Sequence, residues 1–446
     1  MYQRKLLLGG IDERQPVIEI MPQTYKPENP MSALSKMDFL DEETIQCPFP
    51  FYHAAQAEAP VYKLPRSPIE GKDVYLVSSY ALVQSVLRDW ETYSNKFGPY
   101  LNARDVADPE VDAIAATGYT VANTMLTQDP PEQRDYRNVV NKSFTAARIN
   151  KMADYMTEIC DELIDGFIDK GSCDFFADFA SPLPIYVIAD ALGMDRANID
   201  NIKKWSDDAV AAIGRMGGRE SVVQAARSQV ALQKHFVEII EARRLEPKDD
   251  IISILVQGLY KGERPLDIPE MLSILQQLMV AGNETTTTAL GGGLVYIMNQ
   301  PGMADLLAAE PERIPNAVEE ILRLEAPTKH MWRIAAKETE LGGVTLPKDA
   351  VLLLSYDAAN HDPAQFSDSE VCDFSRANAG AHFAFGAGMH FCIGAQLARK
   401  EMAIALERLL SRITNIHLTP GHEDLSYTQS MMHRGYQSLH ISFDKK

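Results

Sequence analysis

The stretch HFAFGAGMHFCIG, residues 382–394, places one cysteine among three glycines, directly before an amphipathic helix predicted over 395–413. Glycines allow backbone conformations that residues with a Cβ resist, and they let the main chain approach a flat ligand closely. Backbone N–H groups and the N-terminus of the following helix favour the thiolate form of Cys392. A thiolate binds iron, so this segment predicts a metal-binding cysteine loop.

Two simpler interpretations of Cys392 are weaker. An isolated cysteine in a tight turn is usually an ordinary buried residue, but the pattern F-x-x-G-x-H-x-C-x-G fixes five positions within ten residues. A catalytic nucleophile would need a base, and His390, two positions away in a turn and without an orienting acid, is poorly placed to be one. The other four cysteines are scattered and form no C-x-x-C, so neither a disulfide framework nor a zinc cluster is expected.

The cysteine loop resembles the haem-binding loop of the cytochrome P-450 family, soluble bacterial type, and the similarity runs from about residue 48 to the C-terminus. The resemblance implies that Cys392 is the axial ligand of haem b (iron protoporphyrin IX), with Phe385, Gly386 and Gly394 in the haem-binding loop. It also implies a mostly α fold with small peripheral β-sheets (α+β), built as a single large domain with a long central helix over the haem.

The rest of the chain agrees with that architecture. No linker, low-complexity run or internal repeat divides its 446 residues, so we expect an irregular N-terminal arm, residues 1–45, and one domain, residues 46–446. A helix beginning at Asp267-x-Pro269 should run to about Asn299, and Asp129 should cap another. The segment 95–125 is expected to be a loop that covers the site, and Gly214–Gly218 a lid hinge. Further helices are predicted at 78–87, 148–170, 182–192, 198–213, 219–244, 249–260, 303–309 and 315–324. Strands are predicted within 61–77 and at 341–346, 350–354, 415–418 and 438–443.

The long helix carries Ala281-Gly282-Asn283-Glu284-Thr285-Thr286. Small residues at Ala281 and Gly282 would leave space for a diatomic ligand beside the haem. The match to the family's A-G-x-E-T motif implies that Glu284 relays protons and that the Thr285 hydroxyl takes part in oxygen activation. The alternative is a threonine run that bonds back to its own helix, which we expect for Thr287 and Thr288.

Charged residues elsewhere match supporting positions of the family. Glu320-x-x-Arg323 places two opposite charges on one helix face, and the resemblance implies a buried triad with Arg376 that orders the loop behind the haem. Arg137, Arg333 and His390 match the positions that bind the haem propionates. Gln133, where many members have histidine, is left out of the site.

We expect the substrate to be a hydrophobic organic molecule such as a sterol, terpenoid or fatty acid. The regions that resemble the family's distal pocket offer adaptable apolar side chains. The candidates are Met125, Met279, Val280, Ala281, Met331, Trp332, Met431 and Met432. Lys329 and His330 would either meet a substrate carboxylate or face solvent.

Composition and length limit the partners. The net charge of −19 argues against nucleic acid and an anionic membrane surface, and no early apolar run is long enough for a signal or an anchor. We therefore expect a cytoplasmic monomer. Cys392 lies close to the C-terminus, so electrons should come from a separate ferredoxin served by an NAD(P)H reductase. Four basic residues would then form either a patch for that partner or solvated charges: Arg134, Lys142, Arg399 and Lys400.

The prediction is thus a monooxygenase that inserts one atom of O2 into its substrate. A haem-thiolate peroxygenase or isomerase is the first alternative, and Glu284-Thr285 argues against it. A haem-based sensor or binding protein would need an output element, which the sequence does not show.

Overall fold

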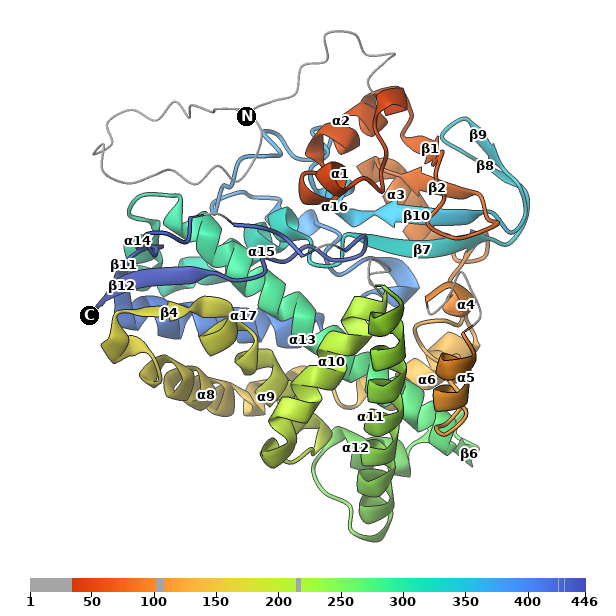
Figure 1. Cartoon of the computed structure of the whole chain (residues 1–446), viewed down its shortest axis with the longest axis horizontal. Coiled ribbons are helices and arrows are strands. Elements are labelled where there is room, and N and C mark those ends of the chain that lie inside the picture. Colours follow the sequence, from red (N-terminus) through yellow and green to blue (C-terminus); the bar gives the residue numbers. More distant parts are fainter. Residues whose placement is uncertain (1–33, 102–107, 214–217, 424, 429) are drawn as a thin grey trace.

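The computed structural model describes residues 34–101, 108–213, 218–423, 425–428 and 430–446. It consists mainly of helices packed around one long helix, with a sheet region at one side (Figure 1). The helices are α1 (Glu42–Gln46), α2 (Phe49–Glu58), α3 (Tyr80–Arg88), α4 (Gly98–Leu101), α5 (Pro109–Ala115), α6 (Glu132–Asn141), α7 (Ala146–Lys151), α8 (Ala153–Asp165), α9 (Pro182–Leu192), α10 (Ile199–Ile213), α11 (Arg219–Leu245), α12 (Ile251–Gln257), α13 (Ile268–Met298), α14 (Met303–Ala309), α15 (Ile314–Glu325), α16 (Tyr356–Asn360) and α17 (Ala395–Arg412).

The strands form small sheets at the edge of this helical body, which confirms the predicted mostly α class. The largest sheet has the order β1-β2-β10-β7-β3, with β10 parallel to β2 and the other pairs antiparallel. The strands are β1 (Val61–Lys63), β2 (Val74–Val77), β3 (Tyr93–Ser94), β4 (Ser172–Asp174), β5 (Leu259–Tyr260), β6 (Arg264–Pro265), β7 (His330–Ala335), β8 (Thr339–Leu341), β9 (Val344–Leu346), β10 (Val351–Ser355), β11 (Ile413–Leu418) and β12 (His440–Lys445).

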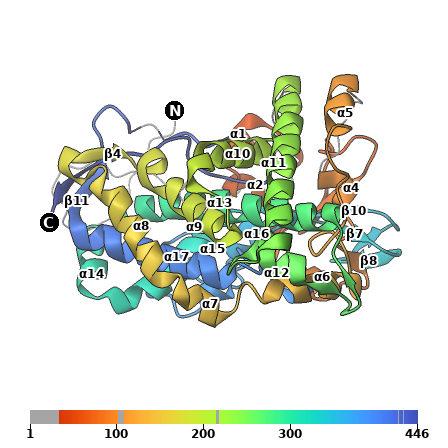
Figure 2. The ribbon, with the colours of Figure 1, turned by 90° about the horizontal axis from the view of Figure 1, so that it is seen from below.

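Helix α13 crosses the middle of the helical body (Figures 1 and 2). Its start is fixed by a capping box, in which the Asp267 side chain accepts from Glu270 N and the Glu270 side chain accepts from Asp267 N. Near its other end, Gly291 and Gly292 let neighbours pack directly on the backbone. An added Cβ would lie 2.2 Å from the Phe176 ring and 2.0 Å from the Glu325 carboxyl carbon, respectively. None of the described helices is both long and apolar enough to cross a membrane.

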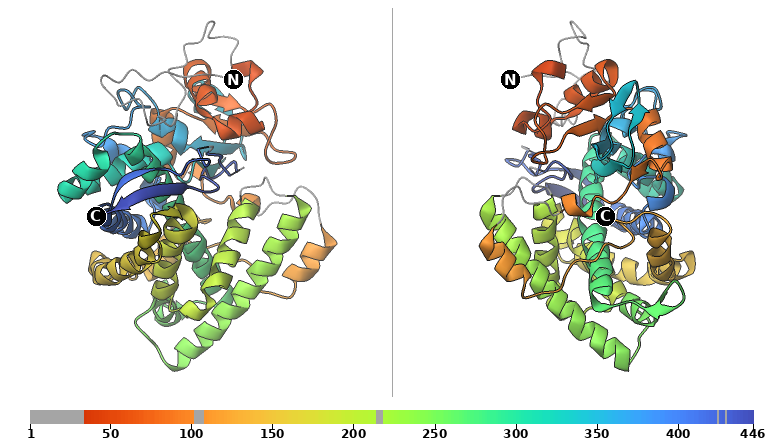
Figure 3. Two further views of the ribbon diagram at one scale, coloured as in Figure 1. Left: turned by 60° about the vertical axis from the view of Figure 1, so that its left-hand side comes forward. Right: turned by 90° about the vertical axis from the view of Figure 1, so that its right-hand side faces the viewer.

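The segment that leads into the site is attached to α11 (Figure 3). At the surface, Arg219 of α11 forms ion pairs with Asp108 (Nε–Oδ2, 2.6 Å) and Glu110 (Nη2–Oε2, 2.9 Å) of the α5 region. Deeper, the buried Gln233 amide exchanges two hydrogen bonds with the backbone of Tyr119, at 2.8 and 3.0 Å. The α5 segment and α11 are therefore joined by both exposed charges and a buried amide.

Several local predictions were wrong. Segment 95–125 contains α4 and α5 rather than loop alone, and β7 was not foreseen. Asp129 does not cap α6. Its carboxylate instead accepts from Ser94 Oγ and Asn95 N, which fixes the start of the segment beside the site. Residues 1–33 of the predicted arm (1–45) and residues 214–217 of the proposed hinge (214–218) lie outside the described residues.

Candidate active site

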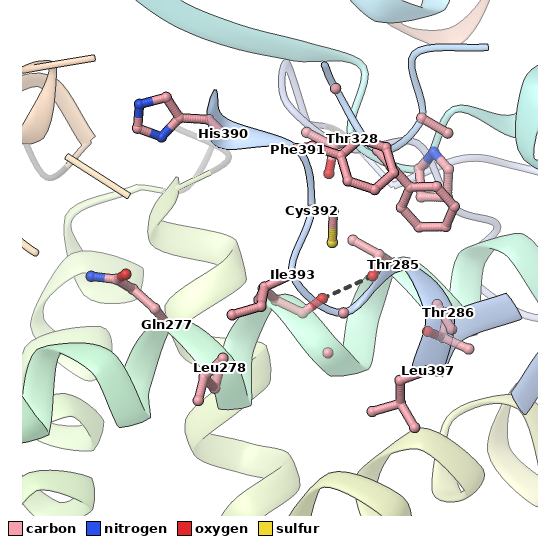
Figure 4. Close-up of a pocket in the computed structure, with 18 of the residues that line it drawn as sticks. Gln277, Leu278, Thr285, Thr286, Thr328, His390, Phe391, Cys392, Ile393 and Leu397 are labelled. Carbon is pink, nitrogen blue, oxygen red and sulfur yellow. Dashed lines mark hydrogen bonds between the residues drawn. The ribbon is translucent and has the colours of Figure 1, made fainter. Parts of the chain in front are cut away.

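A cavity of about 270 Å³ lies between α13 and the cysteine loop, and most of its lining is apolar. The Cys392 sulfur points across it toward the stretch of α13 that carries Thr285 (Figure 4). Residues from widely separated parts of the chain line it, including Met125, Leu126, Arg137, Ile188, Gln277, Leu278, Ala281, Gly282, Thr285, Met331, Arg333, Phe385, His390, Cys392, Leu397 and Glu401. The structure thus brings together residues that are far apart in sequence.

The cysteine loop is held by its own backbone and by α6. Gly386 and Gly388 have φ of 63° and 69°, and a Cβ on Gly388 would lie 2.3 Å from the Leu87 carbonyl oxygen, so glycine is required there. Cys392 N donates to Phe385 O at 2.9 Å, which closes the loop. From α6, Arg137 Nη2 donates to the Phe391 carbonyl at 2.6 Å. These contacts fix where the sulfur points.

The Cys392 side chain has exposed surface, and that surface faces the cavity. Its surroundings act on the thiol in opposite directions. Burial raises the pKa and is the largest effect, while the Gly394 N–H, the Arg137 and Arg399 guanidinium groups and the Ala395 N–H lower it. The N–H groups of Gly394 and Ala395 thus act in the predicted direction, toward the thiolate, while burial acts against it. A coordinated metal ion deprotonates such a thiol outright.

Three cationic or basic side chains converge beside the loop. Arg333 is 3% exposed, and its Nη1 donates to the Trp332 carbonyl at 2.7 Å. Neither Arg333 nor Arg137 forms an ion pair with another described residue. The pKa of His390 is lowered to about 3, first by burial and then by Arg333 and Arg137, and its buried Nε2 has no partner in the described part of the chain. This group of donors lacks an anion and could hold one or two carboxylates.

Behind the loop, Glu320, Arg323 and Arg376 form a buried charged triad. Arg323 binds the Glu320 carboxylate through Nε and Nη2, both at 2.8 Å, and Arg376 Nε reaches Glu320 Oε1 at 3.0 Å. Arg323 also donates to the carbonyls of Asn360 and Ser369, and the Asn360 side chain accepts from Phe383 N at 2.7 Å. The triad is thereby connected to the start of the cysteine loop.

On α13, Ala281, Gly282 and Thr285 all line the cavity. The Thr285 hydroxyl donates to the Ala281 carbonyl at 2.8 Å, so it bonds back to its own helix while facing the cavity. The expectation for Thr287 was wrong, because its hydroxyl donates to Ala180 O at 3.1 Å and joins α13 to the segment before α9.

Glu284 is not among the residues that line this cavity; it faces α10. Its pKa is raised, mainly by burial and then by Asp207, and Lys203 opposes the shift. Asp207 and Lys203 form an exposed ion pair at 2.7 Å. Glu284 therefore lies between a solvent-exposed pair and the helix turn that carries Thr285.

Of the apolar candidates for the substrate pocket, Met125 and Met331 line the cavity along with Ala281. Side chains alternate between the faces of a strand, so Met331 and Arg333 of β7 face the cavity and Trp332 faces the hydrophobic core. The α13 face that lines the cavity is formed by positions such as 278, 281 and 285, which leaves Met279 and Val280 packed on a core cluster. Met431 and Met432 are likewise buried in the core rather than at this cavity.

Sequence reasoning missed three polar residues of the site. Gln133, set aside as a substitution for histidine, is fully buried and donates from Nε2 to the Met389 carbonyl at 2.9 Å. Gln277 lines the cavity on α13, and helical spacing from Thr285 would have found it. Glu401 of α17 also lines the cavity, with a pKa raised to about 8 by burial, and nothing in its sequence context marks it.

The predicted basic group is only partly available to a partner. Arg399 binds the Glu319 carboxylate through Nε and Nη2, at 2.5 and 2.8 Å, and stacks over the Phe385 ring at 4.5 Å. Arg399 is therefore part of the support for the cysteine loop. Arg134 and Lys142 are exposed, and neither they nor Lys400 form an ion pair within the described segments. Lys329 and His330, for which contact with substrate or solvent was expected, are both buried.

Comparisons with known proteins agree with this geometry. The family model described as Cytochrome P450 matches residues 218–432. The chain is 33% identical to 6-deoxyerythronolide B hydroxylase of Saccharopolyspora erythraea, over 84% of this chain and 91% of that enzyme. It is 31% identical to vitamin D(3) 25-hydroxylase of Pseudonocardia autotrophica, over 89% and 94%. The solved structure of cytochrome P450 CYP109Q5 from Chondromyces apiculatus has a TM-score of 0.80 at 30% identity, covering 92% of this chain and 98% of that one.

The site residues fit a haem group. Cys392 presents a sulfur atom to the cavity, and the small residues Ala281 and Gly282 line it from α13. The side chains of Arg137, Arg333 and His390 lack an anionic partner within the described chain, and the haem carries two propionates that need such donors. The otherwise apolar lining matches the faces of a porphyrin ring.

Proposed function

This chain belongs to the cytochrome P450 family, and on that premise we propose that it inserts one atom of O2 into a hydrophobic organic substrate held in the cavity under α13. It is an oxygenase-type oxidoreductase whose cofactor is haem. The observation that carries the proposal is that the Cys392 sulfur points across one apolar cavity toward the part of α13 that carries Thr285.

The residues around the loop would hold and orient the cofactor. Cys392 would bind the iron, and Arg137, Arg333 and His390 would bind the propionates through charge-assisted hydrogen bonds. The triad of Glu320, Arg323 and Arg376 would keep the loop ordered from behind, because its members are almost completely removed from solvent. When bound, a thiolate-ligated haem supplies the iron at which O2 is activated.

Glu284 and Thr285 would deliver protons to the cavity. Burial raises the pKa of Glu284, which brings this carboxyl closer to a value at which it both takes up and releases a proton. The charges of Asp207 and Lys203 act on Glu284, and these two residues form an exposed ion pair from which protons would reach it. The Thr285 hydroxyl has one acceptor in its own helix and faces the cavity, so it is placed to hold a proton donor there.

The lining supports a lipophilic substrate. Ile188, Leu278 and Met331 give the cavity apolar walls, and flexible Met331 suits molecules of varied shape. Sterols, terpenoids and fatty acids are the classes that we propose. The names of two similar enzymes record a hydroxylase of 6-deoxyerythronolide B and one of vitamin D(3), both organic molecules.

Electrons would come from a separate ferredoxin and its NAD(P)H reductase. Arg134 lies beside the cysteine loop, with Nη2 3.6 Å from the Met389 sulfur, and Lys142 is exposed at the end of the same helix region. In a chain with a net charge of −19, such unpaired cations near the iron ligand would attract an acidic partner.

The optical spectrum of the reduced, carbon monoxide-treated holoprotein tests the proposal. A strongly red-shifted Soret band is expected for the wild type, and Cys392→Ala should lose it. A wild-type band typical of histidine-ligated haem would refute the ligand assignment. Product formation should then depend on O2, NAD(P)H, ferredoxin and reductase together, and turnover without the protein partners would refute the electron route.

A further inference from the structure

Gln277 is the polar side chain that α13 places toward the cavity on the N-terminal side of Thr285 (Figure 4). Residues 277, 281 and 285 are spaced by four, so they lie along one face of the helix. Eight residues at a rise of 1.5 Å separate Gln277 from Thr285 by about 12 Å along the helix axis. Gln277 therefore stands at a considerable distance from the part of the cavity where oxygen would react.

The Gln277 amide is held in place at one of its two ends. Nε2 lies 2.9 Å from Thr124 Oγ1, and Thr124 is completely buried. The chain before Thr124 is itself fixed, because Ala122 N donates to Ser273 Oγ of α13 at 2.8 Å. Gln277 Oε1 is buried, and no described residue provides it with a hydrogen-bond partner. One half of a positioned amide is thus left unpaired beside an apolar cavity.

An unpaired polar group in such a position costs free energy until a ligand supplies its partner. The neighbouring lining residues Met125, Leu126 and Leu278 offer no side-chain hydrogen bond. Thr124 can donate as well as accept, so the amide presents either its oxygen or its NH2 group to a ligand. A hydroxyl group pairs with both, since it is a donor and an acceptor.

We infer that Gln277 is a specificity-determining residue that binds a hydroxyl group on the substrate, at a point remote from the oxidised carbon. The inference rests on the proposed function and narrows its substrate class to elongated apolar alcohols. The alcohol oxygen would bind at Gln277, and the apolar body would extend along α13 toward Thr285. A substrate without that hydroxyl would leave the amide unpaired and bind more weakly.

Alkylimidazoles provide a direct test in the haem-loaded enzyme. Their imidazole nitrogen binds haem iron and changes the optical spectrum, so a titration gives Kd for a chain that extends into the cavity. The probes are N-decylimidazole and N-(ω-hydroxydecyl)imidazole, with hexyl, octyl and dodecyl pairs to vary the reach. The variant Gln277→Met keeps the side-chain length but removes the amide.

For the chain length that fits best, the Gln277→Met variant should bind the hydroxyl probe about three- to tenfold more weakly than the wild type does. Its Kd for the alkyl probe should stay within about twofold of wild type, which also shows that the fold is intact. Gln276→Met is the matched control, because Gln276 is the neighbouring glutamine and does not line the cavity. It should leave both Kd values unchanged.

Equal weakening for both probes would mean that Gln277 only fixes the Thr124 segment, and it would overturn the inference. Unchanged binding of both probes would overturn it as well. In either case a normal spectral shift would leave the proposed function standing. The absence of any shift with N-decylimidazole in the wild type would instead overturn the proposed function, and the inference with it.

Discussion

The exchange Glu320→Gln should destabilise the protein far more than the same exchange at the surface. The Glu320 carboxylate is 0% exposed and accepts four hydrogen bonds: two from Arg323, one from Arg376 and one from Asp373 N. Glutamine keeps the shape but removes the charge, and its NH2 group faces a guanidinium donor. Two buried cations would lose their counter-charge, so we expect a loss of roughly 3–5 kcal/mol in the free energy of unfolding.

Glu310→Gln is the matched control, because Glu310 and Arg313 form an ion pair with the same i,i+3 spacing but are about half exposed. That exchange should cost about 0–1 kcal/mol. Urea unfolding of both holoproteins, followed by circular dichroism and by the haem absorbance, measures the difference. The Glu320 variant should also release haem at a lower urea concentration, since the triad is linked to the cysteine loop through Asn360. A loss below about 1 kcal/mol, equal to the control, would refute the argument that burial makes this pair critical.

Three further predictions concern α13 and α17. Thr285→Ala should still consume NADH but form several-fold less product per NADH, with hydrogen peroxide released instead. Thr285→Ser keeps the hydroxyl and should form product as the wild type does. Equal product per NADH in both variants would show that the Thr285 hydroxyl does not deliver protons. Burial raises the pKa of Glu401 to about 8 in the folded protein, from the ordinary 4.5. Between these pH values only the folded protein keeps the proton, so the free energy of unfolding should fall by up to about 1.4 kcal/mol for each unit that the pH rises. Glu401→Gln should flatten that dependence in unfolding experiments from pH 5 to 8, and an unchanged slope would contradict it. Gly292→Ala should lower the free energy of unfolding by about 1–3 kcal/mol, because its Cβ would lie 2.0 Å from buried Glu325. Gly282→Ala should not lower it, because the added Cβ would meet Ile188 at an ordinary contact distance of 3.5 Å. Similar losses of unfolding free energy for both variants would rule out the steric cause.

Much of the fold could be predicted because its signals are local. The start of α13 follows from Asp267 and Pro269, which act within one turn, and α9 and α14 were predicted with their observed bounds. Strand β7 was missed because its residues, HMWRIA, are buried on both sides of an arginine and show no clean alternation. The hydrogen bonds of Asp129 could not be predicted either, because its partners Ser94 and Asn95 belong to another segment of the chain.

In the candidate site, too, the features that could be predicted are local in sequence and the others are not. The cysteine loop and the Glu320–Arg323 pair are short motifs, whereas the pairing of Arg399 with Glu319 joins residues of two helices that are distant in sequence. Trp332 and Met279 were predicted at the pocket because they are apolar residues in segments that resemble the family's distal pocket, without regard to which face each side chain occupies. Side-chain alternation from Arg333, and helical spacing from Thr285, would have separated residues that face the cavity from those that face the core.

The double attachment of the α5 segment to α11 has a mechanical consequence. A motion that separated the two would have to break the ion pairs of Arg219 and also the buried amide contacts of Gln233, whereas a motion that carried both together would break neither. Salt screens the exposed charges but hardly affects the buried amide. The α5 segment and α11 should therefore move as one rigid unit. In salt the ion pairs of Arg219 should weaken, while the hydrogen bonds between Gln233 and Tyr119 persist.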